Sequence, residues 1–128
     1  MSATSKTRLA TLVYALGIVV VSVIPSTGVS MWNLDKVGHY IAYAGLAILV
    51  SLSFESLAAR VAGLIGAIAL GASLEVVQSF VPGRDMSLID EAVNTLGVLT
   101  GAVVFLFRQD DLRRRTTALV GQLRGRKL

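Results

Sequence analysis

Four long apolar blocks, rather than amphipathic stripes, dominate this chain and are separated by short polar connections. Each block approaches the roughly 20 residues that an α-helix needs to cross a bilayer, although the first and the last are short by that measure. Irregular backbone cannot face lipid, so each block is expected to be an α-helix. The predicted spans are about 9–24, 37–54, 61–81 and 92–107.

The overall composition supports lipid as the solvent for these blocks. Hydrophobic residues make up 54% of the 128 residues, and the mean hydropathy is +0.71. One domain of this size lacks the interior to bury so much apolar side chain. The absence of cysteine excludes disulfides and thiolate metal sites. We therefore predict an all-α integral membrane protein, with a four-transmembrane-helix bundle in residues 1–107 and a basic tail in residues 108–128.

Basic residues are distributed unevenly between the two ends of the predicted helices. Ten of the twelve lie before the first block, between the second and third blocks, or in the tail. The positive-inside rule then predicts cytoplasmic N- and C-termini, with the first and third connections on the outer face. Lys6 and Arg8 before an apolar block are also features of a signal peptide, but no clear cleavage site follows. We therefore retain the first block as a span.

Seven of the basic residues lie in the tail. Next to a membrane span, such a tail indicates a cytoplasmic anchor facing anionic lipid, and we expect no nucleic-acid partner. Leu112 and Leu119 belong to a set of apolar residues at helical spacing opposite arginines, which predicts an amphipathic helix on the inner leaflet. A disordered polybasic tail that contributes only to orientation is the alternative.

The predicted topology brings polar residues of three helices into one layer at the outer face. Asp35, His39 and Tyr43 have i, i+4, i+8 spacing, which aligns them on one face of the second helix. On the third and fourth helices, glycine and alanine share a face with the polar residues, and small residues let membrane helices approach closely. We therefore expect the polar side chains to point into the bundle.

Glu75 is the most unusual of these residues, because it lies about 9 Å along the helix from the predicted end of the third span. A charged group in hydrocarbon is costly unless it has a partner. We expect the turn at Pro82-Gly83 to bring Arg84 back over Glu75. Asp35 and Asp90 stand at helix starts, where an N-cap role would also explain them. The candidate partners of Glu75 are Lys36, His39, Arg84 and Asn94.

Two motifs, DKVGHYIAYAGLA and LEVVQSFVPGRDMSLIDEAVNTLG, resemble those of the VanZ-like family of small bacterial membrane proteins. The resemblance implies a multi-pass protein of the bacterial inner (cytoplasmic) membrane. It also implies a cell-envelope link, because the family takes its name from a protein associated with resistance to the glycopeptide teicoplanin. It supplies no substrate. The matching positions are Asp35, Lys36, His39, Tyr43, Glu75, Gln78, Arg84, Ser87, Asp90, Asn94 and Gly97.

The function that we favour from the sequence is binding of an envelope lipid or lipid-linked headgroup at the outer leaflet. Arg84 and Lys36 would hold a phosphate, Arg84 through paired hydrogen bonds. Gln78, Asn94 and Tyr43 would contact sugar or peptide groups. The predicted ligand-binding residues are Lys36, His39, Tyr43, Glu75, Gln78, Arg84, Ser87, Asp90 and Asn94.

Two alternative functions are compatible with the same residues. A purely structural network would hold three helices in register, since hydrogen bonds between membrane helices contribute on the order of 0.6 kcal/mol each. A small membrane enzyme acting on a lipid-linked phosphate or sugar would use His39 and Glu75 as base and acid, with Asp35 orienting the imidazole. No nucleophile with an evident base stands out, so we lean against an enzyme.

We expect no cofactor and no resident metal. One histidine and no cysteine argue against zinc. The expected partners are membrane lipid, anionic lipid at the tail, and a second copy if Gly97 and Gly101 form a dimer face. We favour the interpretation that these glycines pack the fourth helix against the third within one chain. The less favoured metal hypothesis is magnesium or manganese held by Asp35, His39, Glu75 and Asp90.

Overall fold

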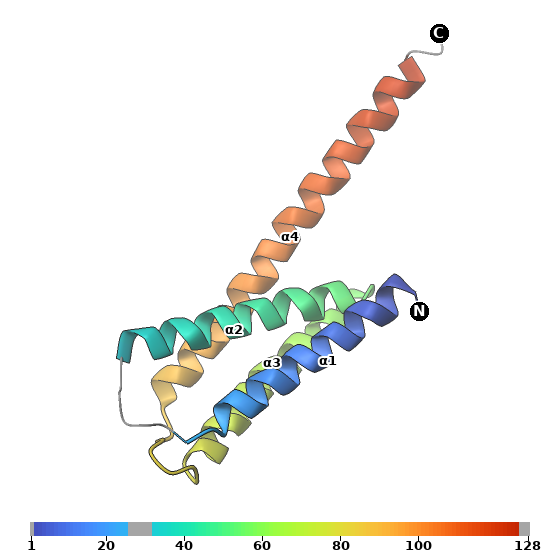
Figure 1. The fold of residues 1–128 in the computed structure, drawn as a ribbon. Coiled ribbons are helices and arrows are strands. Elements are labelled where there is room, and N and C mark those ends of the chain that lie inside the picture. The colour runs from blue at the N-terminus through green and yellow to red at the C-terminus, as the bar shows by residue number, and fades with distance from the viewer. Residues whose placement is uncertain (1, 26–31, 126–128) are drawn as a thin grey trace.

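The computed structural model describes residues 2–25 and 32–125. Within them the chain forms four α-helices: α1 (Ala3–Ser22), α2 (Trp32–Ser53), α3 (Leu57–Gln78) and α4 (Leu88–Gly125). α2 contacts all three other helices, and the C-terminal part of α4 projects beyond the bundle (Figure 1). All four helices are long and apolar enough to cross a membrane. The predicted all-α fold, with four helices long and apolar enough to span a membrane, is therefore confirmed.

Serine side chains cap the first turns of three helices, and Ser2 does so for α1. The Oγ of Ser56 accepts a hydrogen bond from the N–H of Ala59 at 3.2 Å and caps α3. At the start of α4, the Oγ of Ser87 accepts from the N–H of Asp90 at 3.2 Å. The hypothesis that Asp90 is itself the N-cap is therefore wrong, and its carboxylate is left for another partner.

Several helix ends differ from the predicted spans. α1 begins at Ala3, well before residue 9, and α2 begins at Trp32. α3 ends at Gln78, short of the predicted limit, because the chain reverses through Gly83 with a φ of 76°. The earlier starts of α1 and α2 arise because polar residues can extend a helix without contributing to its apolar block.

The fourth helix does not end where the apolar block ends. It continues through residues 108–125 as one 38-residue helix, about 57 Å long at 1.5 Å per residue. The described part of the tail is therefore a straight extension of α4 and not a separate helix. Its contact with a membrane surface stays a prediction, and residues 126–128 lie outside the described residues.

The closest approach between two helices joins α2 and α4. A Cβ atom added to Gly97 would lie 2.6 Å from the backbone oxygen of Tyr40, and one on Gly101 would lie even closer to that of Ala44. The prediction that these glycines pack α4 against α3 is therefore wrong, because their face is covered by α2. The same face is not open to a second copy of the chain. The core beside it consists of Tyr43, Leu46, Ala47, Val50, Ala67 and Val98.

The outer surface of the bundle is apolar. Leu12, Ile65 and Leu99 are among many large hydrophobic side chains that are more than half exposed. Contiguous apolar surface of this extent is unfavourable in water but suits a hydrocarbon solvent. Polar side chains such as Glu75 and Asn94 are instead buried between the helices. The fold is that of a multi-pass membrane protein.

Candidate functional site

Polar side chains gather where α1 and α3 end and where α2 and α4 begin. We call this region the polar end of the bundle. Four of its side chains are almost fully buried: Tyr43, Glu75, Gln78 and Asn94 are 2%, 3%, 4% and 1% exposed. The structure brings the predicted ligand-binding residues together here, whereas their binding role stays a prediction. The polar end consists of those nine residues together with Asp35 and Glu91.

An ion pair joins α2 to α4 at the polar end. The Nζ of Lys36 donates to the Oδ1 of Asp90, and the two side chains are 21% and 14% exposed. Partial burial reduces the solvent screening that weakens surface pairs. The pair therefore ties the first turns of both helices together. This contact gives Lys36 a bracing role, which competes with the predicted contact to a ligand phosphate.

A second connection between these helices runs through the imidazole of His39. Its Nδ1 lies 2.9 Å from the Oδ1 of Asn94, and the Nδ2 of Asn94 donates to the Oε2 of Glu91 at 3.4 Å. Thr95 donates to the other Glu91 oxygen at 3.2 Å. Glu91 was not among the predicted ligand-binding residues, although its i+3 and i+4 spacing to Asn94 and Thr95 is a detectable signal.

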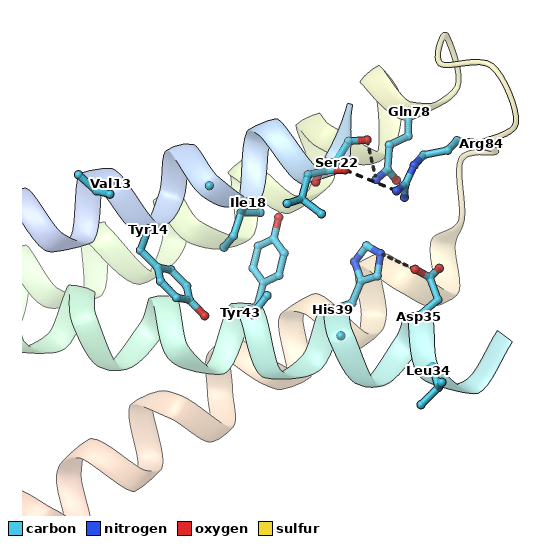
Figure 2. Close-up of a pocket in the computed structure, with 14 residues that line it drawn as sticks. Val13, Tyr14, Ile18, Ser22, Leu34, Asp35, His39, Tyr43, Gln78 and Arg84 are labelled. Carbon is cyan, nitrogen blue, oxygen red and sulfur yellow. Dashed lines mark hydrogen bonds and ion pairs between the residues drawn. The ribbon is translucent and has the colours of Figure 1, made fainter. Parts of the chain in front are cut away.

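The other ring nitrogen of His39 faces a carboxylate. The Nε2 atom lies 4.0 Å from the Oδ1 of Asp35, one helical turn earlier on α2 (Figure 2). Asp90 approaches from α4, so that one ligand atom from each of Asp35, His39 and Asp90 lies within 4.8 Å of the others. These are the polar-end residues whose geometry fits a metal ion. Glu75, the fourth residue of the metal hypothesis, does not belong to this group.

Glu75 is satisfied by the backbone of the loop that follows α3. Its Oε2 accepts a hydrogen bond from the N–H of Ser87 at 3.0 Å. Arg84 contacts α1 instead, donating from Nε to the oxygen of Ile24 at 3.0 Å and from Nη2 to that of Val21 at 3.5 Å. The prediction that Arg84 folds back over Glu75 is therefore wrong. Ile24 lies just beyond α1, where no further helical N–H follows to bond its carbonyl, and the guanidinium of Arg84 takes that place.

A cavity of about 570 Å³ opens beside these residues, between α1 and α2. The walls of the cavity are mostly apolar. Where the cavity meets the polar end of the bundle, it is lined by Asp35, His39, Gln78 and Arg84. Figure 2 shows Tyr43 pointing from α2 toward α1, deeper in the cavity than His39. The α1 wall is formed by Val13, Tyr14, Gly17, Ile18, Val21 and Ser22.

The cavity divides the predicted ligand-binding residues into two groups. His39, Tyr43, Gln78 and Arg84 line it, and Gln78 also donates to the backbone oxygen of Ser22 at 3.3 Å. The contribution of α1 was missed, because that helix carries no polar motif and its wall is recognisable only once it is packed on α2. The predicted residues that do not line the cavity are Lys36, Glu75, Ser87, Asp90 and Asn94.

The fold and the polar end together define a class of protein: a small multi-pass helical membrane protein with buried ionisable groups at one end and an adjoining cavity. A family model described as VanZ/LLP1 matches residues 4–109, which include α2, α3, nearly all of α1, the first part of α4 and the whole polar end. The chain therefore belongs to the VanZ-like family. No significant match was found among curated proteins or among solved structures.

Proposed function

We propose that the protein binds an envelope lipid or a lipid-linked molecule in the cavity between α1 and α2. The observation that carries this proposal is the division of the cavity into a long apolar wall and one polar end. An amphipathic molecule has the same division. The volume of about 570 Å³ also falls within the usual range for ligand pockets.

Arg84 is the cation that lines the cavity, and it would meet an anionic headgroup. A guanidinium has five N–H donors, so its contacts with the carbonyls of Ile24 and Val21 leave donors for a phosphate. His39 and Gln78 would contact other polar parts of the headgroup. The apolar chain would lie against Ile18 and its neighbours on α1.

The proposed orientation places the polar end at the outer leaflet of the bacterial cytoplasmic membrane. Arg8 and Arg60 both contact the residues that end α2, at the opposite end of the bundle. Together with the basic tail they support cytoplasmic N- and C-termini under the positive-inside rule. A role in glycopeptide resistance would follow if the ligand were a lipid-linked envelope precursor.

A structural function is the competing hypothesis, and one observation favours it. Throughout residues 2–25 and 32–125, every buried side-chain nitrogen or oxygen atom has a hydrogen-bond partner. A polar end that only braces the helices would be satisfied in this way. An enzyme is less well supported, because His39 lines the cavity whereas Glu75 is bonded to the backbone of Ser87.

Filling the cavity separates the binding hypothesis from the structural one. Gly17 and Gly38 both line the cavity, and a Cβ on either would meet no atom within 4 Å. Gly66 has the same free space but does not line the cavity. Leucine at each position therefore gives two variants with a filled cavity and one matched control.

The measurement is the thermal stability of the purified protein with panels of phospholipids and polyprenyl phosphates. A ligand present at 100 times its dissociation constant should stabilise the wild type by about 2.7 kcal/mol. We expect Gly66→Leu to retain this stabilisation and Gly17→Leu and Gly38→Leu to lose most of it. Equal stabilisation of all three variants, or none of the wild type by any lipid, would contradict the proposal.

A further inference from the structure

The polar end contains a group of ligand atoms that lipid binding does not require. Asp35 and His39 project from successive turns of α2, and Asp90 joins them from the first turn of α4. One atom from each lies within 4.8 Å of the others. Ligands that each lie roughly 2 Å from one ion are at most about 4 Å apart, so the three side chains would close up slightly around a bound ion.

The hydrogen bonds of Asn94 determine which nitrogen of His39 carries the proton. The Nδ2 of Asn94 donates to Glu91, so its Oδ1 is the atom that faces the Nδ1 of His39 at 2.9 Å. An amide oxygen only accepts, and therefore Nδ1 must be the donor. In the neutral imidazole the lone pair then lies on Nε2, the nitrogen that faces Asp35.

The contact between His39 and Asp35 is therefore one between two acceptors. At 4.0 Å, Nε2 and the carboxylate oxygen are too far apart for a hydrogen bond. A cation between them would accept both lone pairs. Asn94 would then orient the ring in the way that outer ligands orient metal-bound histidines.

The charges at the polar end also favour an additional cation. Its carboxylates are Asp35, Glu75, Asp90 and Glu91, whereas its permanent cations are Lys36 and Arg84. Lys36 contacts Oδ1 of Asp90, and a carboxylate has lone pairs on both oxygens for a further ligand. Arg84 is engaged with the carbonyls of α1. Negative charge is therefore in excess where three helices meet.

We propose that Asp35, His39 and Asp90 bind a divalent cation of the manganese or magnesium type. Two carboxylates and one imidazole form a mainly oxygen-donor set, which suits manganese, and the chain has no thiolate to favour a softer metal. The site reverses our expectation of no metal. Glu75, included in the less favoured metal hypothesis, is left out because its carboxylate does not belong to the group of ligand atoms that lie close together.

The cation site lies at the polar end of the cavity, because Asp35 and His39 both line it. Magnesium and manganese are commonly held by a few carboxylates together with the phosphate of a ligand. A bound phosphate could complete the coordination of the ion, and only this second step rests on the proposed lipid function. The three-residue site itself requires no lipid.

Titration of chelator-treated protein with Mn²⁺, followed by electron paramagnetic resonance, tests the site without any lipid. We expect one saturable Mn²⁺ per chain, with affinity reduced at least tenfold by Asp35→Asn. Asp35 has an exposed side chain, so this substitution preserves the helix packing. The matched control is Glu55→Gln, an exposed carboxylate in the loop between α2 and α3 that should bind Mn²⁺ as the wild type does.

His39 offers a second readout, because it is the only histidine in the chain. Nitrogen NMR should show one imidazole with a protonated Nδ1, and diamagnetic Cd²⁺ should shift the Nε2 signal in the wild type but not in Asp35→Asn. Equal Mn²⁺ affinity in Asp35→Asn and wild type, or an Nε2 signal that Cd²⁺ leaves unchanged in the wild type, would overturn the proposal. Gly17→Leu should still bind Mn²⁺, so failure of the lipid proposal is distinguishable from failure of this one.

Discussion

The two ends of the bundle use polar side chains in opposite ways. At the end away from the polar end, Arg8 donates to the backbone oxygen of Ser53 at 3.2 Å, and Arg60 donates to that of Phe54 at 2.7 Å. Each guanidinium also lies over an aromatic ring, Arg8 over Phe54 at 5.5 Å and Arg60 over Phe105 at 4.9 Å. Cations here meet the carbonyls that end α2, which is a structural arrangement.

At the polar end carboxylates outnumber the cationic side chains, in contrast to the two arginines at the opposite end. Arg84 performs the same task there, since it donates to the last carbonyls of α1. The remaining polar groups include four carboxylates and an imidazole, and they adjoin a cavity. Completing a helix end therefore explains both guanidinium groups at the opposite end but only Arg84 and Gln78 at the polar end. The carboxylates and His39 instead join α2 and α3 to the start of α4, and Asp35 and His39 also line the cavity.

The largest expected loss of stability comes from forcing α2 and α4 apart. This pair of helices runs from the polar end to the opposite end of the bundle. Alanine at Gly101 would place a Cβ against the backbone oxygen of Ala44. Because the obstructing atom belongs to the backbone, the two helices would have to move apart. Overpacking of this kind costs about 1–3 kcal/mol. Unfolding of purified protein in mixed micelles should therefore show a clear loss of stability.

Gly66→Ala is the matched control for this substitution. A Cβ at Gly66 meets no atom within 4 Å, and alanine is favoured over glycine within a helix by about 1 kcal/mol. We expect this variant to be as stable as the wild type or slightly more so. Similar stability of Gly101→Ala and Gly66→Ala would contradict the close α2–α4 contact.

An intermediate effect is expected when the two equivalent arginines are exchanged for glutamine. Arg8→Gln and Arg84→Gln each remove a guanidinium that donates to a helix-end carbonyl, so each should lose about 0.5–1.5 kcal/mol of stability. Only Arg84 lines the cavity. The stabilisation by an anionic lipid should therefore fall in Arg84→Gln and persist in Arg8→Gln.

Both arginine variants are expected to be less stable, so lipid binding must be measured where the same fraction of each is folded. Thermal unfolding with and without lipid supplies both quantities from one experiment. An equal loss of lipid-dependent stabilisation in both variants would contradict binding of the lipid headgroup by Arg84 in the cavity.

The sequence was sufficient for the helices and for their polar layer, because apolar length and i+4 spacing are local properties. It was insufficient for contacts that depend on which helices become neighbours. The spacing of Gly97 and Gly101 indicates a close contact but not that α2 is the partner. Likewise, the partner of Glu75 is a backbone N–H whose position depends on the path of the loop.

The same reasoning explains why the cavity was not predicted and why the cation site was only a less favoured hypothesis, which also included Glu75. The α1 wall is apolar and resembles any lipid-facing surface until it is packed on α2. The exposed lone pair of His39 depends on a hydrogen bond to Asn94, which lies 55 residues later in the chain. Long-range pairing of this kind leaves no periodic signal in one sequence.

The smallest expected effect is that of removing the projecting end of α4. The described side chains of residues 111–120 are exposed, so deletion of residues 112–128 should change the unfolding free energy of the bundle by less than about 0.5 kcal/mol. Deletion from residue 105 should cost more, because it removes Phe105 from Arg60 along with Gln109, whose Oε1 lies 3.5 Å from that guanidinium. Both truncations are measured by thermal unfolding in the same detergent. A large loss from the shorter deletion would show that the extension stabilises the bundle, and the opposite end would then reach further along α4 than the contacts of Arg60 indicate.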